Sequence, residues 1–268
     1  MHAFGTMEGG SARFPSDRTP RVRRGRPWTA AARIVFVGSI LLASISGCAQ
    51  EANLSSPKPQ LVVLVNSGAP ANNLLASQFC GAVIVGAHTL ETAKHCVVNR
   101  KPSEFVAVVG ANNICGGQPK TGRHVTIVKT ELSQTADLAV LTATGPALSP
   151  AAVDMNFRVR AGQKVVAWGW GASHSSSYFS CTPTPKDLEA SSGQACLKLQ
   201  GSASTASIGV HFCALPTGAD KLNTCQGDSG GPVYTSVKGV AKVIAVTSGG
   251  TGCGPKDLGT YVYLRAHM

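Results

Sequence analysis

The stretch Cys225-Gln226-Gly227-Asp228-Ser229-Gly230-Gly231-Pro232 decides how the rest of the chain is interpreted. It places a serine in a short turn that is flanked by glycines, closed by a proline and preceded by a cysteine. Glycine permits backbone angles that other residues avoid, so successive N–H groups of such a turn can point into one small space. A hydroxyl beside convergent N–H donors is the minimum apparatus for acyl transfer, a nucleophile with an oxyanion hole. An ordinary loop with a solvated serine is the alternative.

A serine nucleophile needs a base, and the base needs a group that orients it. The candidate base is His95, which is followed by Cys96. The candidate orienting group is Asp137, because an acid that opens an apolar run is expected to be partly buried and paired. Alone, the histidine could be structural and the aspartate could be a turn residue. Together with Ser229 they indicate a catalytic triad.

Short apolar segments separated by turn residues predict an all-β chain. Charged residues make up 14% of the chain and it contains 30 glycines, which favours short strands over long helices. A Pro-rich break at 145–150 divides the segments into two series, which predicts two antiparallel barrels or sandwiches over residues 59–150 and 151–268. The segments are 61–65, 79–85, 105–109, 124–128, 138–141, 163–168, 233–234, 243–246 and 260–264.

Three segments, in this order, resemble the trypsin/chymotrypsin family of serine endopeptidases: Thr92-Ala-Lys-His-Cys96, Asp137-Leu-Ala-Val-Leu141 and Gly227-Asp-Ser-Gly-Gly-Pro232. The order His, Asp, Ser separates this family from subtilisins and α/β-hydrolases. Two further segments, Phe79-Cys80-Gly81 and Ala167–Gly171, are similar to family segments, and the likeness runs from about residue 59 to residue 264. The resemblance implies two antiparallel six-stranded β-barrels with the active site at their interface.

The resemblance also implies residue roles. Ser229 attacks the scissile carbonyl, His95 carries the proton, and Asp137 holds the imidazolium. The N–H groups of Gly227 and Ser229 receive the oxyanion. We therefore expect a serine endopeptidase that acts on proteins or peptides without a cofactor. A catalytically silent binding or scaffold module of the cell envelope is the main alternative, and an esterase with the same triad is a more distant one.

Substrate preference is read from positions around the nucleophile. The resemblance implies that Asn223, six residues before Ser229, forms the floor of the specificity pocket, with Gly250 and Gly259 at its walls. It also implies that Ser248 hydrogen-bonds the triad aspartate and pairs with the substrate backbone. Because Asn223 carries no charge, we expect a medium or large neutral side chain rather than Arg or Lys.

Three positions depart from the family pattern. Lys94 stands beside the histidine where a small residue is usual, and an ammonium facing the site would disfavour the paired imidazolium. Gly249 replaces a tryptophan that walls the cleft. No Ile-Val-Gly-Gly segment precedes the first strand, so the sequence does not identify the cation that would pair with Asp228.

The nine cysteines become an even set of eight once Cys48 is set aside, which predicts four disulfides in an exported chain. There is no C-x-x-C or H-x-x-x-H spacing, so we expect no metal. The resemblance implies the pairs Cys80–Cys96, Cys225–Cys253 and Cys196–Cys213. Cys115 and Cys181 remain, and no family pair is matched to them.

Residues 1–48 are typical of a targeting segment. A cationic region, 21–33, precedes the short apolar run 34–45 and then Ser46-Gly47-Cys48, the order of an export signal. Residues 45–48 also resemble the bacterial lipoprotein box, in which Cys48 is lipidated and attaches the chain to the membrane; a plain signal peptide cleaved nearby is the alternative. Residues 49–58 are expected to form a tether. The protein is therefore predicted to be exported, either lipid-anchored in the cell envelope or secreted.

The net charge of +11 is unevenly distributed. Residues 1–33 carry seven arginines and two acidic residues, which leaves 17 basic and 11 acidic residues elsewhere, without a dense cluster. A nucleic-acid partner is therefore not expected. We expect a monomer.

Overall fold

The computed structural model describes residues 53–54, 60–70, 72–116, 122–172, 179–191, 196, 209–217 and 221–265. Residues 48–268 form one compact unit, which contains all of these ranges. The predicted export signal, Cys48 and most of the predicted tether lie outside the described residues. In the described part of the chain, no helix has both the length and the apolar character needed to cross a membrane.

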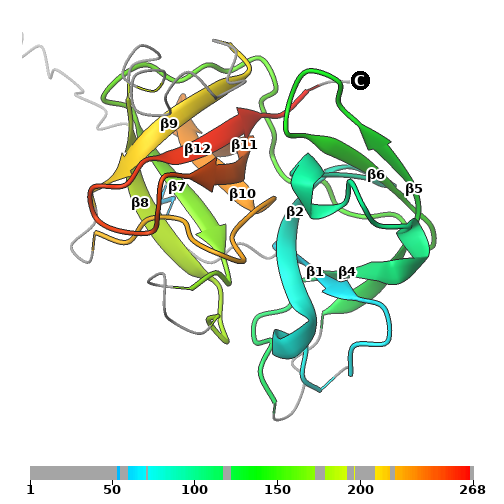
Figure 1. Cartoon of the computed structure of the whole chain (residues 1–268). Coiled ribbons are helices and arrows are strands. Elements are labelled where there is room, and N and C mark those ends of the chain that lie inside the picture. Colours follow the sequence, from blue (N-terminus) through cyan, green and yellow to red (C-terminus); the bar gives the residue numbers. More distant parts are fainter. Residues whose placement is uncertain are drawn as a thin grey trace, which may run out of the picture. The chain divides into compact units, whose positions relative to one another are not determined.

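The first six strands close into an antiparallel barrel in the order β1-β2-β3-β6-β5-β4 (Figure 1). Alternate residues of a small barrel point inward, so Val62 and Leu64 of β1 meet Val125 and Ile127 of β5 in its core. The strands are β1 Val62–Asn66, β2 Gln78–Gly86, β3 Thr89–Thr92, β4 Phe105–Val109, β5 Arg123–Leu132 and β6 Ala139–Ala143.

The next six strands close into a second antiparallel barrel in the order β10-β11-β12-β9-β8-β7. Val165, Leu188 and Ile244 pack in its core with Tyr261, and all four are fully buried. The strands are β7 Lys164–Gly169, β8 Thr184–Ala190, β9 His211–Pro216, β10 Pro232–Val237, β11 Val240–Gly250 and β12 Gly259–Tyr263. The expectation of an all-β fold with two six-stranded barrels is confirmed.

The two barrels touch through backbone as well as side chains. The N–H of Gly81, in β2, donates to the carbonyl of Ser229 at 2.7 Å. A Cβ at position 81 would lie 2.8 Å from the Cα of Gly231, closer than real Cβ contacts come. Glycine is therefore required where β2 meets the serine turn, and this contact positions the site described below.

Four disulfides link segments that are distant in sequence, namely Cys80–Cys96, Cys115–Cys181, Cys196–Cys213 and Cys225–Cys253. Three of these pairs are the ones that the resemblance implies. Cys115 is paired with Cys181, for which the resemblance offers no counterpart. The Cys80–Cys96 bond ties β2 to the short 3-10 helix Lys94–Cys96, and so fixes the position of His95.

Candidate active site

His95 and Asp137 are joined by two hydrogen bonds. The imidazole Nδ1 lies 2.7 Å from Asp137 Oδ2, and the backbone N–H of His95 donates to Asp137 Oδ1 at 2.8 Å. The aspartate lies just before β6 and the histidine just after β3, and these two strands pair side by side. The side chain of His95 is 47% exposed, so the imidazole can reach a substrate while the carboxylate holds its far edge.

Asp137 also receives a hydrogen bond from the second barrel. The hydroxyl of Ser248, in β11, donates to Oδ2 at 2.7 Å. Burial raises the pKa of Asp137, but hydrogen bonds from His95 and Ser248 and the imidazole charge outweigh it and bring the pKa below its ordinary value. An ionised carboxylate only accepts hydrogen bonds, so Nδ1 of His95 carries a proton, and in the neutral imidazole Nε2 is the acceptor.

Lys94 does not approach the imidazole through its ammonium group. Its Nζ donates to the backbone carbonyl of Ser133 at 3.0 Å. The hydroxyl of Ser133 in turn accepts the N–H groups of Thr135 and Ala136 at 3.3 and 3.2 Å. Lys94 therefore supports the turn that presents Asp137, a role that the sequence did not indicate.

The serine turn lies against the end of β3. Thr92 Oγ1 donates to the carbonyl of Gly81 at 2.7 Å, and Gly81 donates to the carbonyl of Ser229. A Cβ on Gly230 would collide with both Thr92 Oγ1 and the carbonyl oxygen of Gly81, so Gly230, at φ +76°, must be glycine. These contacts bring Ser229 to the chain segment that carries His95.

The hydrogen bonds of the described residues include none between the Ser229 hydroxyl and His95. Such bonds are often long before substrate binds and tighten in the reacting complex. The two N–H groups at positions 227 and 229 are likewise unused within the described part of the chain, whereas the N–H of Asp228 donates to Cys225 O at 3.0 Å. Free, fixed donors on both sides of Asp228 are what an oxyanion hole requires.

A cavity of about 110 Å³ opens beside Ser229. Among the residues that the structure describes, its lining contains no ionisable acid or base, and the Cys225–Cys253 disulfide joins two of its walls. Gly250, which the resemblance implies at a wall of the specificity pocket, lines this cavity, and so does Gly249. The described residues that line it are Thr224, Cys225, Gln226, Ser229, Thr247, Gly249, Gly250, Gly252 and Cys253.

Asn223 and Gly259, which were also expected at the pocket, are not among the lining residues. Asn223 is fully buried, accepts the N–H of Thr224 at 2.8 Å and donates to the carbonyl of Asp257 at 2.5 Å. Its polar atoms therefore satisfy backbone groups inside the wall. Ser248 directs its hydroxyl to Asp137 and is not a lining residue either.

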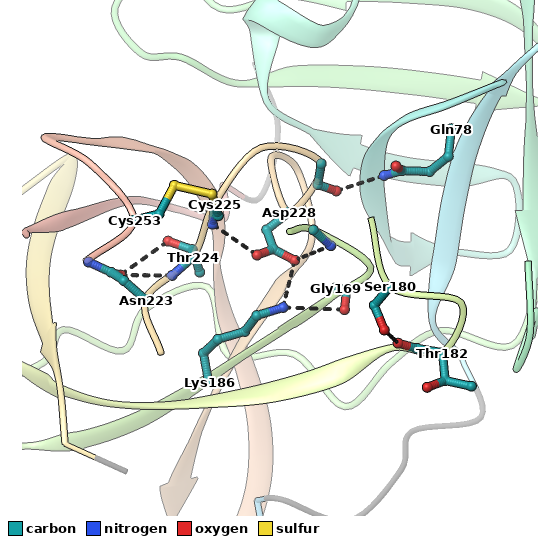
Figure 2. A network of polar contacts seen from close by, with 12 residues as sticks. Gln78, Gly169, Ser180, Thr182, Lys186, Asn223, Thr224, Cys225, Asp228 and Cys253 are labelled. Carbon is teal, nitrogen blue, oxygen red and sulfur yellow. Dashed lines mark hydrogen bonds and ion pairs between the residues drawn. A yellow bond between two sulfur atoms is a disulfide. The ribbon is translucent and has the colours of Figure 1, made fainter. Parts of the chain in front are cut away.

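A buried ion pair joins Asp228 of the serine turn to Lys186 (Figure 2). Lys186 Nζ, from β8, is 2.9 Å from Asp228 Oδ1, and both side chains are 1% exposed. Lys186 was not among the residues predicted from the sequence. The alternation of residues in β8 could have indicated that Lys186 is buried, because Lys186 points to the same side of the strand as Leu188 and Ala190.

Ligand atoms of Cys80, His95 and Cys96 lie within 4.8 Å of one another, the spacing of a metal site. Both sulfurs belong to one disulfide, however, so neither is a thiolate. This group is therefore explained by the disulfide that holds the histidine loop.

Comparison with known proteins gives consistent matches. The trypsin family model matches residues 48–267. The chain is 28% identical over 200 residues to a trypsin from Saccharopolyspora erythraea, covering 71% of this chain and 84% of that protein. It is 30% identical over 205 residues to mouse transmembrane protease serine 11E, covering 71% of this chain and 47% of the relative.

Rat transmembrane protease serine 11G is 27% identical over 190 residues, covering 66% of this chain and 45% of the relative. The chain thus spans about half the length of each of these transmembrane proteases. Among solved structures, neuropsin, a serine protease expressed in the limbic system of mouse brain, superposes with a TM-score of 0.62 at 22% identity. That match covers 80% of this chain and 92% of neuropsin, and it shows the shared fold.

Proposed function

The chain belongs to the trypsin family, and we propose that it is a serine endopeptidase that hydrolyses peptide bonds in proteins or peptides. The observation that carries this proposal is the His95–Asp137 pair, held by two hydrogen bonds at the end of the strand that packs on the Ser229 turn. No cofactor enters the reaction that these side chains would perform.

The proposed reaction follows from the positions of the donors and acceptors. Ser229 Oγ attacks the scissile carbonyl carbon while Nε2 of His95 takes the hydroxyl proton. The carbonyl oxygen becomes an oxyanion that accepts from the N–H groups of Gly227 and Ser229, each donor contributing about 3–4 kcal/mol. His95 then gives its proton to the leaving amine, which departs and leaves an acyl group on Ser229. Water, activated by the same imidazole, releases the acid product.

The first test is active-site labelling of the full chain with a fluorophosphonate. We expect wild-type protein to be labelled and Ser229→Ala to be unlabelled, because only an activated serine reacts at a useful rate. Ser236→Ala, which removes a half-buried hydroxyl from β10, is the matched control and should label like wild type. Folded wild-type protein that takes no label would favour the silent scaffold module instead.

We further propose that the substrate residue before the scissile bond is neutral. Support comes from the cavity lining, where the polar groups are hydroxyls, an amide and backbone rather than carboxylates. A substrate Arg or Lys side chain would need a carboxylate in this cavity to be bound tightly. A panel of chromogenic peptides should show the best kcat/KM for medium or large neutral residues. Dominant cleavage after Arg or Lys would contradict this preference.

The four disulfides and the trypsin relatives support an exported or secreted protein. Lipidation of Cys48 is a separate proposal that rests on the sequence before it. Metabolic labelling with an alkyne fatty acid should tag the full chain expressed in a bacterium and should not tag Cys48→Ala. Release of an untagged chain beginning near Ala49 would instead identify a plain signal peptide.

A further inference from the structure

Every oxygen of the buried Asp228 carboxylate is bound from within the second barrel (Figure 2). Oδ1 accepts from the ammonium of Lys186 at 2.9 Å and from the N–H of Gly171 at 2.8 Å. Oδ2 accepts from the N–H of Cys225 at 3.0 Å. The carboxylate therefore has a single orientation.

Two glycines and a pair of hydrogen-bonded strands surround this carboxylate. A Cβ on Gly169 or Gly171 would overlap the Asp228 side chain, so both positions must be glycine. Lys186 comes from β8, where it is paired with Ala167 of β7, and its ammonium also lies 3.4 Å from the carbonyl of Gly169. Two hydrogen-bonded strands thus hold the cation in place.

The orientation of Asp228 controls the groups next to it in sequence. Gly227 and Ser229 lie on either side, and their N–H groups are the proposed oxyanion donors. The carbonyl of Gln226, which shares a planar peptide group with the N–H of Gly227, accepts the N–H of Ala172 at 2.9 Å. The carbonyl of Asp228, which shares a peptide group with the N–H of Ser229, accepts the N–H of Gly231 at 2.9 Å. With the side chain and these carbonyls fixed, the two N–H groups are each held in one orientation.

A buried carboxylate is strongly unfavourable without a cation, so loss of the ammonium would release Asp228 and the turn around it. We propose that Lys186 is a positioning residue for catalysis: its ammonium holds Asp228, and hence the oxyanion donors, in the working geometry. The cation is supplied by an internal strand, so the site forms without an ammonium from a newly released amino terminus. This inference rests on the proposed function.

The main experiment compares Lys186→Met with Lys186→Arg and wild type in the full chain. Lys186→Met should lower kcat/KM and the rate of fluorophosphonate labelling on the order of 100-fold, through kcat more than KM, the effect of removing an oxyanion donor. Lys186→Arg keeps the charge and should recover much of this loss. Lys129→Met breaks an exposed ion pair of similar length, at 3.0 Å, and should label within about twofold of wild type.

The outcomes separate the two proposals. Wild-type protein that neither labels nor cleaves peptides overturns the proposed function. Wild type that labels, with folded Lys186→Met labelling equally fast, overturns the positioning role alone. A purely structural role would lower the melting temperature and leave kcat unchanged below it.

A second variant covers the case in which Lys186→Met does not fold. Lys186→Met combined with Asp228→Asn removes both charges, which is often tolerated where loss of one is not. The folded double variant should still label far more slowly than wild type. Labelling at the wild-type rate would overturn the positioning role.

The amino-terminal part of the proposal has its own test. The full chain is fused behind a folded partner through a linker that proteases do not cut. Intact-mass spectrometry after labelling should find the probe on the species that still carries the fusion. Label that appears only on chains with a newly released amino terminus would overturn this part.

Discussion

Each barrel contributes one aspartate at the candidate site, and the two aspartates differ in burial and in the cation that pairs with them. Asp137, from the first barrel, has a side chain that is 25% exposed and pairs with an imidazole that is 47% exposed. Asp228, from the second barrel, is 1% exposed and pairs with an equally buried ammonium. Both carboxylates also accept a backbone N–H, at 2.8 Å from His95 and at 2.8 Å from Gly171.

This difference separates two tasks. The proton carrier must change its charge during each reaction, which requires contact with substrate and solvent. The Lys186–Asp228 pair has no proton to move, and burial makes the pair rigid because neither charge can leave without the other. We therefore expect changes at Asp137 to affect the rate mainly, and changes at Asp228 to affect both rate and folding.

The largest expected effect is on the rate, in Asp137→Asn. An asparagine in place of the triad aspartate of this family leaves the wrong tautomer of the histidine and lowers kcat about 10⁴-fold. The free energy of unfolding at pH 7 should change by less than about 1 kcal/mol, because the group is partly solvated. Peptide kinetics and urea unfolding measure the two quantities. Equal losses in both would remove the contrast between the two aspartates.

Asp228→Asn should give the largest loss of stability. It leaves the Lys186 ammonium buried without its counter-charge, which costs about 3–5 kcal/mol when one partner of a buried pair is removed. Urea unfolding of the variant, in a Ser229→Ala background to prevent self-digestion, measures this cost. A loss below about 1 kcal/mol would mean that the pair is not the rigid element described here.

Glu91 sharpens the comparison, because it is a carboxyl that is 1% exposed and forms no ion pair among the described residues. Burial raises its pKa from 4.5 to about 8, although a backbone hydrogen bond from Arg265 and the charge of Arg265 act in the opposite direction. The folded state therefore binds the proton more tightly than the unfolded state. The stabilisation of the folded state by the protonated Glu91 carboxyl is complete below about pH 4.5 and is lost as the pH rises through about 8.

Between pH 5 and pH 9 wild-type protein should thus lose roughly 2–4 kcal/mol of unfolding free energy relative to Glu91→Gln, which cannot ionise. Urea unfolding of both proteins at the two pH values is the measurement. Parallel pH profiles would show that Glu91 does not carry a raised pKa.

The smallest effect is expected at the surface. Glu131→Gln breaks the ion pair with Lys129, in which the lysine side chain is 61% exposed and the glutamate side chain 48% exposed. The variant should lose less than about 1 kcal/mol of unfolding free energy. The difference should shrink further in 0.5 M salt, since exposed charges are screened. A loss as large as that of Asp228→Asn would show that burial is not what separates the two ion pairs.

The fold and the family were predictable because their signals are local. Alternating apolar strands, glycine turns and the order of the His, Asp and Ser segments can each be read from a few adjacent residues. Cys80, Cys96 and Cys225 lie inside such segments, and they belong to two of the three pairs that the resemblance implies.

The missed features depend on side-chain direction and on partners that are far apart in sequence. Lys186 is 42 residues from Asp228, and a lysine in a strand is ordinarily expected at the surface. The hydrogen bonds of Asn223, to the N–H of Thr224 and to the carbonyl of Asp257, likewise could not be read from the sequence, and the expectation that Asn223 forms the pocket floor stays a prediction. The sequence gives the residue type at each position, and only packing decides which way the side chain points.

The close approach of Gly81 and Gly231 has a practical consequence for engineering. Because two backbones meet there without intervening side chains, the halves of this molecule can be redesigned only as a matched set. Hybrids that exchange one barrel for that of a distant relative should assemble an active catalyst only when both glycines are retained. Circular permutants with their new ends away from Gly81 and Gly231 should be more stable than permutants that are opened at this contact.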